Sequence, residues 1–160
     1  MRRSKPAMPT VRLHFSPAPV HVHTARLVGI AVARRAGVPE EVLDEVRLAI
    51  GEACSRAVAL HQRYGLTDQL VVEMTDFPDY VVQVTDRAPV VEAVRTVQDA
   101  TVAELSGSGV PVDGLSEEAV AAEMALALLT GLVEDLRVRP AADGPGTEVR
   151  MTWPLWRNVR

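Results

Sequence analysis

Hydrophobic and polar residues recur along the chain with two distinct periods, and these periods predict its first elements. Residues 11–15 alternate between apolar and polar side chains, which is typical of a short strand. Residues 21–36 follow a helical period, which places on one side of the helix Leu27, Ile30 and Ala31. Gly37 supplies the left-handed residue that commonly ends a helix. The chain is therefore predicted to start with a strand and a helix.

The strongest helical period lies in residues 39–62. Apolar residues recur there at steps of three and four and form one continuous stripe: Val42, Val46, Ala49, Ala53, Ala57 and Leu60. Acidic residues near the start of the segment suit the positive end of a helix dipole: Glu40, Glu41 and Asp44. The segment is predicted to be a long amphipathic helix.

The residues that follow the long helix predict a β-hairpin. Residues 69–75 and 80–85 are β-rich, and the Asp76–Asp79 turn lies between them. Residues 87–117 show no firm period and contain loop-type dipeptides of glycine with serine or aspartate. A connection of this length inside one domain is usually functional or mobile.

A third helix and a second hairpin are predicted in the last part of the chain. A capping signature at Ser116 precedes a helix over residues 118–136, which carries Met124, Leu128, Leu132 and Leu136. Residues 136–139 and 148–153 flank a turn with glycine and proline, which predicts two paired strands. This order of elements predicts an α+β fold, a two-layer sandwich with helices on one face of a mostly antiparallel sheet.

Length and composition fit one globular domain. The 160 residues suit a single domain over residues 11–156, preceded by a flexible basic tail over residues 1–10. A hydrophobic share of 48% and a charged share of 24% exclude wholesale disorder. The net charge of −4 favours neither nucleic acid nor an anionic membrane as a partner. No apolar run approaches the roughly 18 residues of a membrane span, so we expect a cytoplasmic protein.

The residue types that most often carry chemistry give weak signals. The single cysteine, Cys54, has no evident base near it on the long helix, so we expect a packed thiol rather than a nucleophile. His21 and His23 stand two residues apart, but no third ligand follows at metal-site spacing, so no metal site is expected. The Gly/Ser stretch at residues 106–109 lacks the strand-then-helix context and the lysine of a P-loop.

One pair of oppositely charged residues on the long helix has the spacing of an ion pair. Glu52 and Arg56 are four residues apart, so their side chains lie one turn apart on the same face. The simple interpretation is a surface ion pair worth about 0.2–0.5 kcal/mol. In a partly buried pocket the pair is worth more, because either partner alone is left uncompensated. We predict that the two side chains form an ion pair.

Three segments, in the right order, resemble the ATP-binding motifs of the anti-sigma-factor serine kinases. Residues 47–58 read RLAIGEACSRAV and are similar to the first box of that family. Residues 84–89 read VTDRAP and resemble its second box, and residues 146–155 read GTEVRMTWPL and resemble its last strand. The family belongs to the GHKL superfamily, with the ATP-binding domains of histidine kinases and gyrase. The resemblance implies the histidine-kinase-like ATPase fold.

The resemblance also implies a nucleotide site in which several family residues are replaced. Glu52 takes the general-base position and Asp86 the adenine-recognising position. Arg56 stands where the family has a magnesium-holding asparagine, and an arginine offers only donors and a positive charge. At three positions where the family has glycine, this chain has Ala88, Glu123 and Ala125. Their side chains obstruct the close approach of the backbone that glycine allows. The vestigial site is predicted to comprise Glu52, Arg56, Asp86, Ala88, Glu123, Ala125 and Thr147.

These replacements imply a regulator rather than an enzyme. We expect a bacterial, partner-switching, anti-sigma-factor-like protein that binds a sigma factor, a STAS-type anti-sigma factor antagonist, or both, without ATP turnover. No catalytic residue and no cofactor are expected, and ATP with magnesium binds only if the altered pocket still accepts it. The first alternative is an active ATP-dependent serine/threonine protein kinase that phosphorylates the antagonist. The second alternative is a structural dimerisation domain.

Self-association is a further expectation. Members of the family typically act as dimers. The first strand and the first helix offer apolar side chains beyond the evident need of one core: Leu13, Phe15, Leu27 and Ile30. A homodimer through this surface is therefore predicted.

Overall fold

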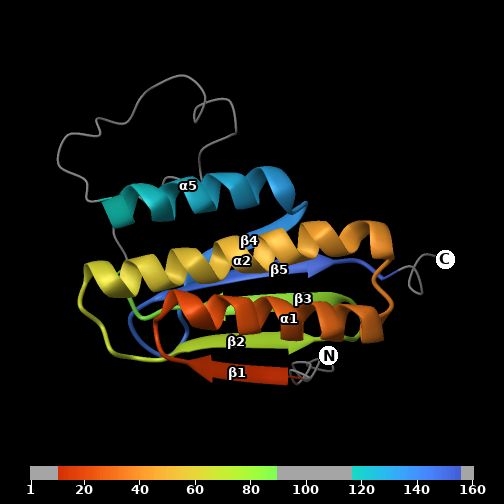
Figure 1. Cartoon of the computed structure of the whole chain (residues 1–160), viewed down its shortest axis with the longest axis horizontal. Helices are drawn as coiled ribbons and strands as arrows, with labels where there is room; N and C mark the ends of the chain where they lie inside the picture. The colour runs from red at the N-terminus through yellow and green to blue at the C-terminus, as the bar shows by residue number, and fades with distance from the viewer. Residues whose placement is uncertain (1–10, 90–116, 156–160) are drawn as a thin grey trace, which may run out of the picture.

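The computed structural model describes residues 11–89 and 117–155 (Figure 1). Its elements are, in chain order, β1 (Val11–Phe15), α1 (Pro19–Ala36), α2 (Glu40–Arg63), β2 (Leu70–Thr75), β3 (Tyr80–Thr85), α5 (Glu117–Leu132), β4 (Asp135–Pro140) and β5 (Thr147–Trp153). The predicted strands and helices of these ranges are all present, with ends that differ by a few residues. The predicted tail over residues 1–10 and most of the unassigned segment 87–117 lie outside the described residues.

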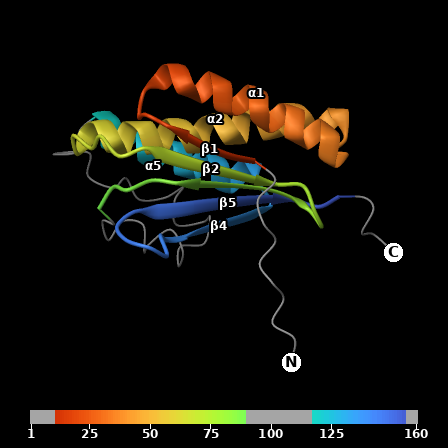
Figure 2. The same cartoon turned by 90° about the horizontal axis from the view of Figure 1, so that it is seen from below.

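The five strands form one antiparallel sheet in the order β1-β2-β3-β5-β4. Figures 1 and 2 show α1, α2 and α5 together on one face of this sheet. The fold is therefore a two-layer α+β sandwich, which confirms the predicted architecture.

The register of the sheet separates an apolar row from a polar row. The pairing places side by side, across all five strands, Leu13, Val72, Val84, Val149 and Val138. This row belongs to the core under the helices. The next row points to the opposite face, because side chains alternate along a strand. It consists of Arg12, Glu73, Gln83, Arg150 and Arg137.

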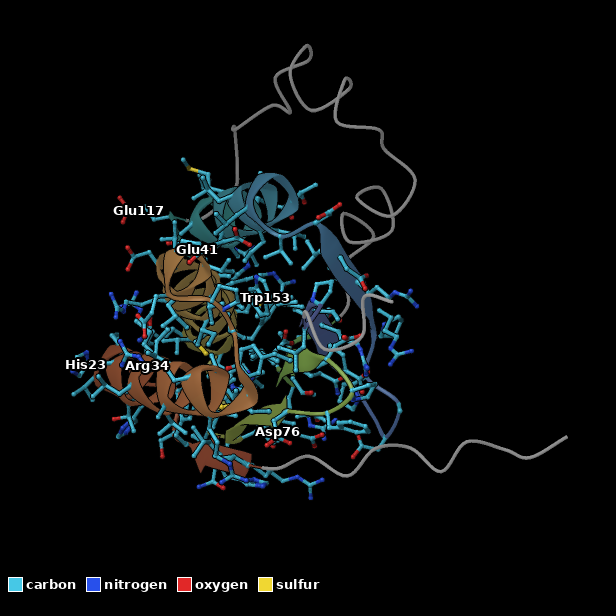
Figure 3. All side chains as sticks on the ribbon, turned by 90° about the vertical axis from the view of Figure 1, so that its right-hand side faces the viewer. His23, Arg34, Glu41, Asp76, Glu117 and Trp153 are labelled. Carbon is cyan, nitrogen blue, oxygen red and sulfur yellow. The ribbon has the colours of Figure 1, made fainter. Side chains whose placement is uncertain are left out.

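Helix α2 lies between α1 and α5 in the helical layer (Figure 1). The middle of its predicted apolar stripe is fully buried, and the stripe ends, Val42 and Leu60, are partly buried. Nε1 of Trp153, which is labelled in Figure 3, donates a hydrogen bond of 2.9 Å to the Glu45 carboxylate. This bond links the end of β5 to α2. No helix within the described ranges is long and apolar enough to cross a membrane.

The third helix ends earlier than predicted, and it does not bury two of the apolar residues that it was predicted to carry. Helix α5 ends at Leu132, so Leu136 belongs to β4 and not to the helix. Met124 and Leu128 are 62% and 57% exposed. The helix packs instead through a neighbouring face, which consists of Ala122, Ala125, Leu126 and Leu129.

The apolar surface predicted for self-association is only partly exposed. Leu27 is 59% exposed on α1, whereas Ile30 is buried in the core, so the expectation for Ile30 is wrong. Leu13 and Phe15 are half-buried on β1 and pack against the core. Because α1 lies along the sheet, the face that carries Ile30 is needed to cover the strands.

Candidate functional site

The carboxylate of Asp86 is the centre of a buried polar cluster. Asp86 follows directly after β3 and is 1% exposed. Its backbone N–H donates to the carbonyl oxygen of Thr147 at 3.0 Å and extends the pairing of β3 with β5. Its Oδ1 accepts a hydrogen bond of 2.9 Å from the backbone N–H of Ala88, in the manner of an Asx turn. The sheet and this turn hold the carboxylate in one orientation.

Arg56 on α2 engages the other carboxylate oxygen. Nη1 of Arg56 donates to Oδ2 of Asp86 at 3.2 Å, and the two side chains are 4% and 2% exposed. Opposite charges so far from water are coupled more strongly than a pair at the surface. Both oxygens of Asp86 are therefore already occupied by donors from within the protein.

This ion pair replaces the one that was predicted between Glu52 and Arg56. Among the residues that the structure describes, Arg56 pairs with Asp86, and no ion pair joins it to Glu52. Glu52 is partly exposed and lines a groove between α2 and α5. Arg56 turns toward the sheet because Asp86 is a buried anion, and a buried charge requires a partner.

The turn between β4 and β5 encloses Asp86 from the other side. Gly146 in this turn has a φ of +122°, and a Cβ at this position would collide with the backbone carbonyl of Asp86. The guanidinium of Arg87, the next residue after Asp86, forms an ion pair of 2.9 Å with Asp143 in the same turn. The turn therefore contacts the chain around Asp86 at two points, namely the close approach of Gly146 and the ion pair of Arg87 with Asp143.

His61 is a member of this cluster that sequence reasoning missed. The imidazole extends from α2, is 0% exposed, and accepts at Nε2 a hydrogen bond of 2.9 Å from the backbone N–H of Arg87. Its Nδ1 is buried without a hydrogen-bond partner among the described residues. Since Nε2 accepts, the neutral tautomer carries its proton on Nδ1. No sequence signal marks this contact, because the partner is a backbone group and not a side chain at helical spacing.

Burial sets the protonation states of the cluster. It raises the pKa of the Asp86 carboxyl, and the positive charge of Arg56 opposes that rise. It lowers the pKa of the His61 imidazole, against the pull of Asp86 and Asp68. A charged pair of Asp86 and Arg56 beside a neutral His61 is therefore the favoured state at neutral pH.

The structure brings together only some of the residues predicted for the nucleotide site. The hydrogen-bonded cluster contains Arg56, Asp86, Ala88 and Thr147. Three others lie on the helices outside these hydrogen bonds, namely Glu52, Glu123 and Ala125. Glu123 is exposed on α5, whereas Ala125 is buried in the packing of that helix.

Cys54 is the packed thiol that the sequence predicted. It is 0% exposed, and burial raises its pKa to about 12, so the reactive thiolate is disfavoured. Within residues 11–89 and 117–155, no group of three or more histidine, cysteine, aspartate or glutamate side chains is placed to hold a metal ion.

Replacing His61 by leucine is expected to lower the free energy of unfolding by about 1–3 kcal/mol at neutral pH. The reason is that the buried N–H of Arg87 loses its acceptor. Urea denaturation measures the change, and His23→Leu, at an exposed histidine on α1 (Figure 3), is the matched control.

The same substitution is expected to remove part of the pH dependence of stability. Because the folded-state pKa of His61 is lowered, this group favours the folded state fully above pH 6.5. As the pH falls below 6.5, the unfolded imidazole takes up a proton first, and stability is lost until the folded-state pKa is reached. If the unfolding free energies of the wild type and of His61→Leu changed equally with pH below 6.5, the role assigned to His61 would be contradicted.

The sequence model of the histidine kinase-like ATPase domain matches residues 15–153 of the chain. This range includes the whole cluster around Asp86 and all of the helices. A search of the curated proteins returned no match.

Proposed function

The chain belongs to the histidine kinase-like ATPase domain family, and from this premise we propose that it is a regulatory protein of the anti-sigma-factor type. It acts by binding other proteins, and it does not turn over ATP. Its partners are a sigma factor, a STAS-type anti-sigma factor antagonist, or both, in a partner-switching system of the bacterial cytoplasm. It works as a homodimer, for which the exposed Leu27 and the edge strand β1 provide surface.

The observation that carries this proposal is the buried ion pair of Arg56 and Asp86. The resemblance assigns Asp86 to adenine recognition, yet both of its carboxylate oxygens already accept hydrogen bonds from Arg56 and Ala88. The side chain of Asp86 is only 2% exposed, so an adenine amine can reach it only after the groups that cover it move aside. Displacing the guanidinium is costly, because it leaves a buried carboxylate uncompensated.

The other replaced positions fit a magnesium nucleotide no better. Arg56 stands at the position of the metal-holding asparagine, and a guanidinium has no lone pair to offer a cation. Glu123 adds a negative charge where the resemblance places the phosphates, and Ala125 adds a side chain where it places a glycine. Phosphoryl transfer depends on a bound metal ion and on the positioning of the phosphates, and the replaced residues are unsuited to both.

One observation favours the alternative of an active serine/threonine kinase. Glu52, at the general-base position, is partly exposed and has no ion pair with Arg56 among the described residues. A carboxylate in this state retains the ability to accept a proton.

Incubation with labelled ATP, magnesium and candidate STAS-type antagonists is expected to give no phosphotransfer. Calorimetric titration of the wild type with magnesium ATP is expected to give no binding heat, because the guanidinium of Arg56 already pairs with the carboxylate of Asp86. The Arg56→Asn variant tests whether Arg56 is what prevents ATP binding, since it removes the guanidinium and restores the family residue. Robust phosphotransfer by the wild type would establish the kinase alternative instead.

A further inference from the structure

An exposed groove with an apolar floor runs between α2 and α5. It has a volume of about 520 Å³. Apart from Glu52, its lining consists of apolar side chains and one glycine. Leu48, Met124 and Leu128 line it and are 50%, 62% and 57% exposed. Large apolar side chains that gather at one exposed site mark an interaction surface.

The acidic residues near this groove lie on the same helix faces as its lining. On α2, Glu41 is three turns from Glu52 and shares its face. On α5, Glu117 lies two turns before Met124 on one face. Figure 3 shows Glu41 and Glu117 on the side of the two helices that faces away from the sheet. The groove thus has a carboxylate in its lining and one toward each end.

Of the exposed arginines on the two helices, only Arg63 shares the face of these carboxylates. It is three turns beyond Glu52, in the last turn of α2, and its guanidinium lies 5.5 Å from the centre of the Tyr64 ring. The sequence of α5 contains glutamates and no basic residue. On α2, Arg56 is buried with Asp86. Arg47 lies about 100° around the helix from Leu48 and pairs with Asp44 at 3.1 Å. The groove is therefore both apolar and acidic.

We propose that this groove binds a basic amphipathic helix of a partner protein. Apolar side chains at i, i+3 or i+4, and i+7 of that helix pack on the exposed apolar side chains, and its flanking lysines or arginines meet the three carboxylates. The acidic rim repels an anionic lipid surface. This inference rests on the proposed function as a protein-binding regulator, and it adds the chemistry of the partner's docking segment.

The probe for this site is a labelled synthetic helix of about 18 residues, with leucine at i, i+3, i+4 and i+7 and lysine elsewhere. A second peptide with the same leucine pattern and glutamate in place of lysine is the charge control. Fluorescence anisotropy with the full chain is expected to show binding of the lysine peptide, and binding of the glutamate peptide at least about tenfold weaker.

Two serine substitutions at exposed apolar residues show whether the peptide uses the groove. Leu128→Ser is expected to weaken binding of the lysine peptide by about tenfold, because an apolar anchor of the groove is lost. Val20→Ser removes an exposed apolar side chain (70%) on α1 and is expected to leave binding unchanged. Both residues are exposed, so both variants are expected to fold, and circular dichroism verifies this.

Three results would overturn the assignment. The first is equal binding of the two peptides, or equal loss in the two variants. The second is a change of sedimentation mass in Leu128→Ser, which would make the groove a contact between copies of this chain. The third is binding of phosphatidylglycerol vesicles that Leu128→Ser abolishes. None of these results bears on phosphotransfer, so a failure here is distinct from a failure of the proposed function.

Discussion

The Arg56→Met variant is expected to lose about 3–5 kcal/mol of unfolding free energy at neutral pH, the range measured when one partner of a buried ion pair is removed. Methionine fills much of the volume of the arginine stem but leaves Asp86 as a buried charge with one hydrogen bond, from Ala88. Urea denaturation followed by circular dichroism measures the loss. An exposed pair is the control: Arg34→Met breaks the contact of Arg34 with Glu40 and is expected to cost less than about 1 kcal/mol.

The pH dependence of this variant identifies the cause of the loss. Without Arg56, the pKa of Asp86 rises further, because the positive charge that most strongly opposes the effect of burial is gone. A protonated Asp86 carries no charge, so the loss is expected to be smaller at about pH 5 than at about pH 8. Adding Asp86→Asn to Arg56→Met removes the charge directly and is expected to recover part of the stability. A loss below about 1 kcal/mol, or one that does not vary with pH, would contradict a buried charge at this site.

The Gly146→Ala variant is expected to lose about 2–6 kcal/mol, or to fail to fold. The substitution puts a side chain at a φ of +122°, and its Cβ collides with the backbone carbonyl of Asp86. Backbone strain of this kind costs about 1–3 kcal/mol and overpacking a similar amount. This carbonyl belongs to the backbone directly after β3, so it cannot rotate away as a flexible side chain does. Thermal denaturation of the purified variant, or its yield in soluble form, reports the effect.

Another glycine provides the matched control for this substitution. Gly131 lies near the end of α5, and a Cβ built there meets no atom within 4 Å. Gly131→Ala is therefore expected to be neutral or to stabilise the protein by up to about 1 kcal/mol, because alanine favours a helix more than glycine does. Similar losses in both variants would show that the close approach at Asp86 does not determine the effect.

The periods of the sequence were sufficient to predict the elements and their layers. Along strands β1, β2 and β3, residues that face the helices alternate with more exposed residues, so the period of two is clear. The apolar stripe of α2 likewise follows one face of the helix. The order of elements then leaves few ways to cover a sheet from one side. The buried face of α5 was harder to predict, because apolar residues lie all around this helix. Its spacing does not decide between the Met124–Leu128 face and the face that contains Ala125 and Leu129.

Four members of the buried cluster were predictable from the sequence, but His61 and the contacts between the members were not. Asp86, Ala88, Arg56 and Thr147 were named from motif positions, and the hydrogen bonds of the cluster join these four. Helical spacing suggested Glu52 as the partner of Arg56, because a local pair is the only kind that spacing can indicate. The true partner is 30 residues away in the chain. Burial decided between the two carboxylates, and burial depends on the packing of α2 against the sheet.

Because Cys54 is buried, the reactivity of its thiol reports on unfolding of the protein. The sequence has one cysteine, which is 0% exposed and whose pKa is about 12. A thiol reagent therefore reacts with the protein only when α2 leaves the core, and no engineered label is needed. The rate of that reaction under native conditions gives the free energy of opening at the centre of the molecule, in the same units for the wild type and for each variant.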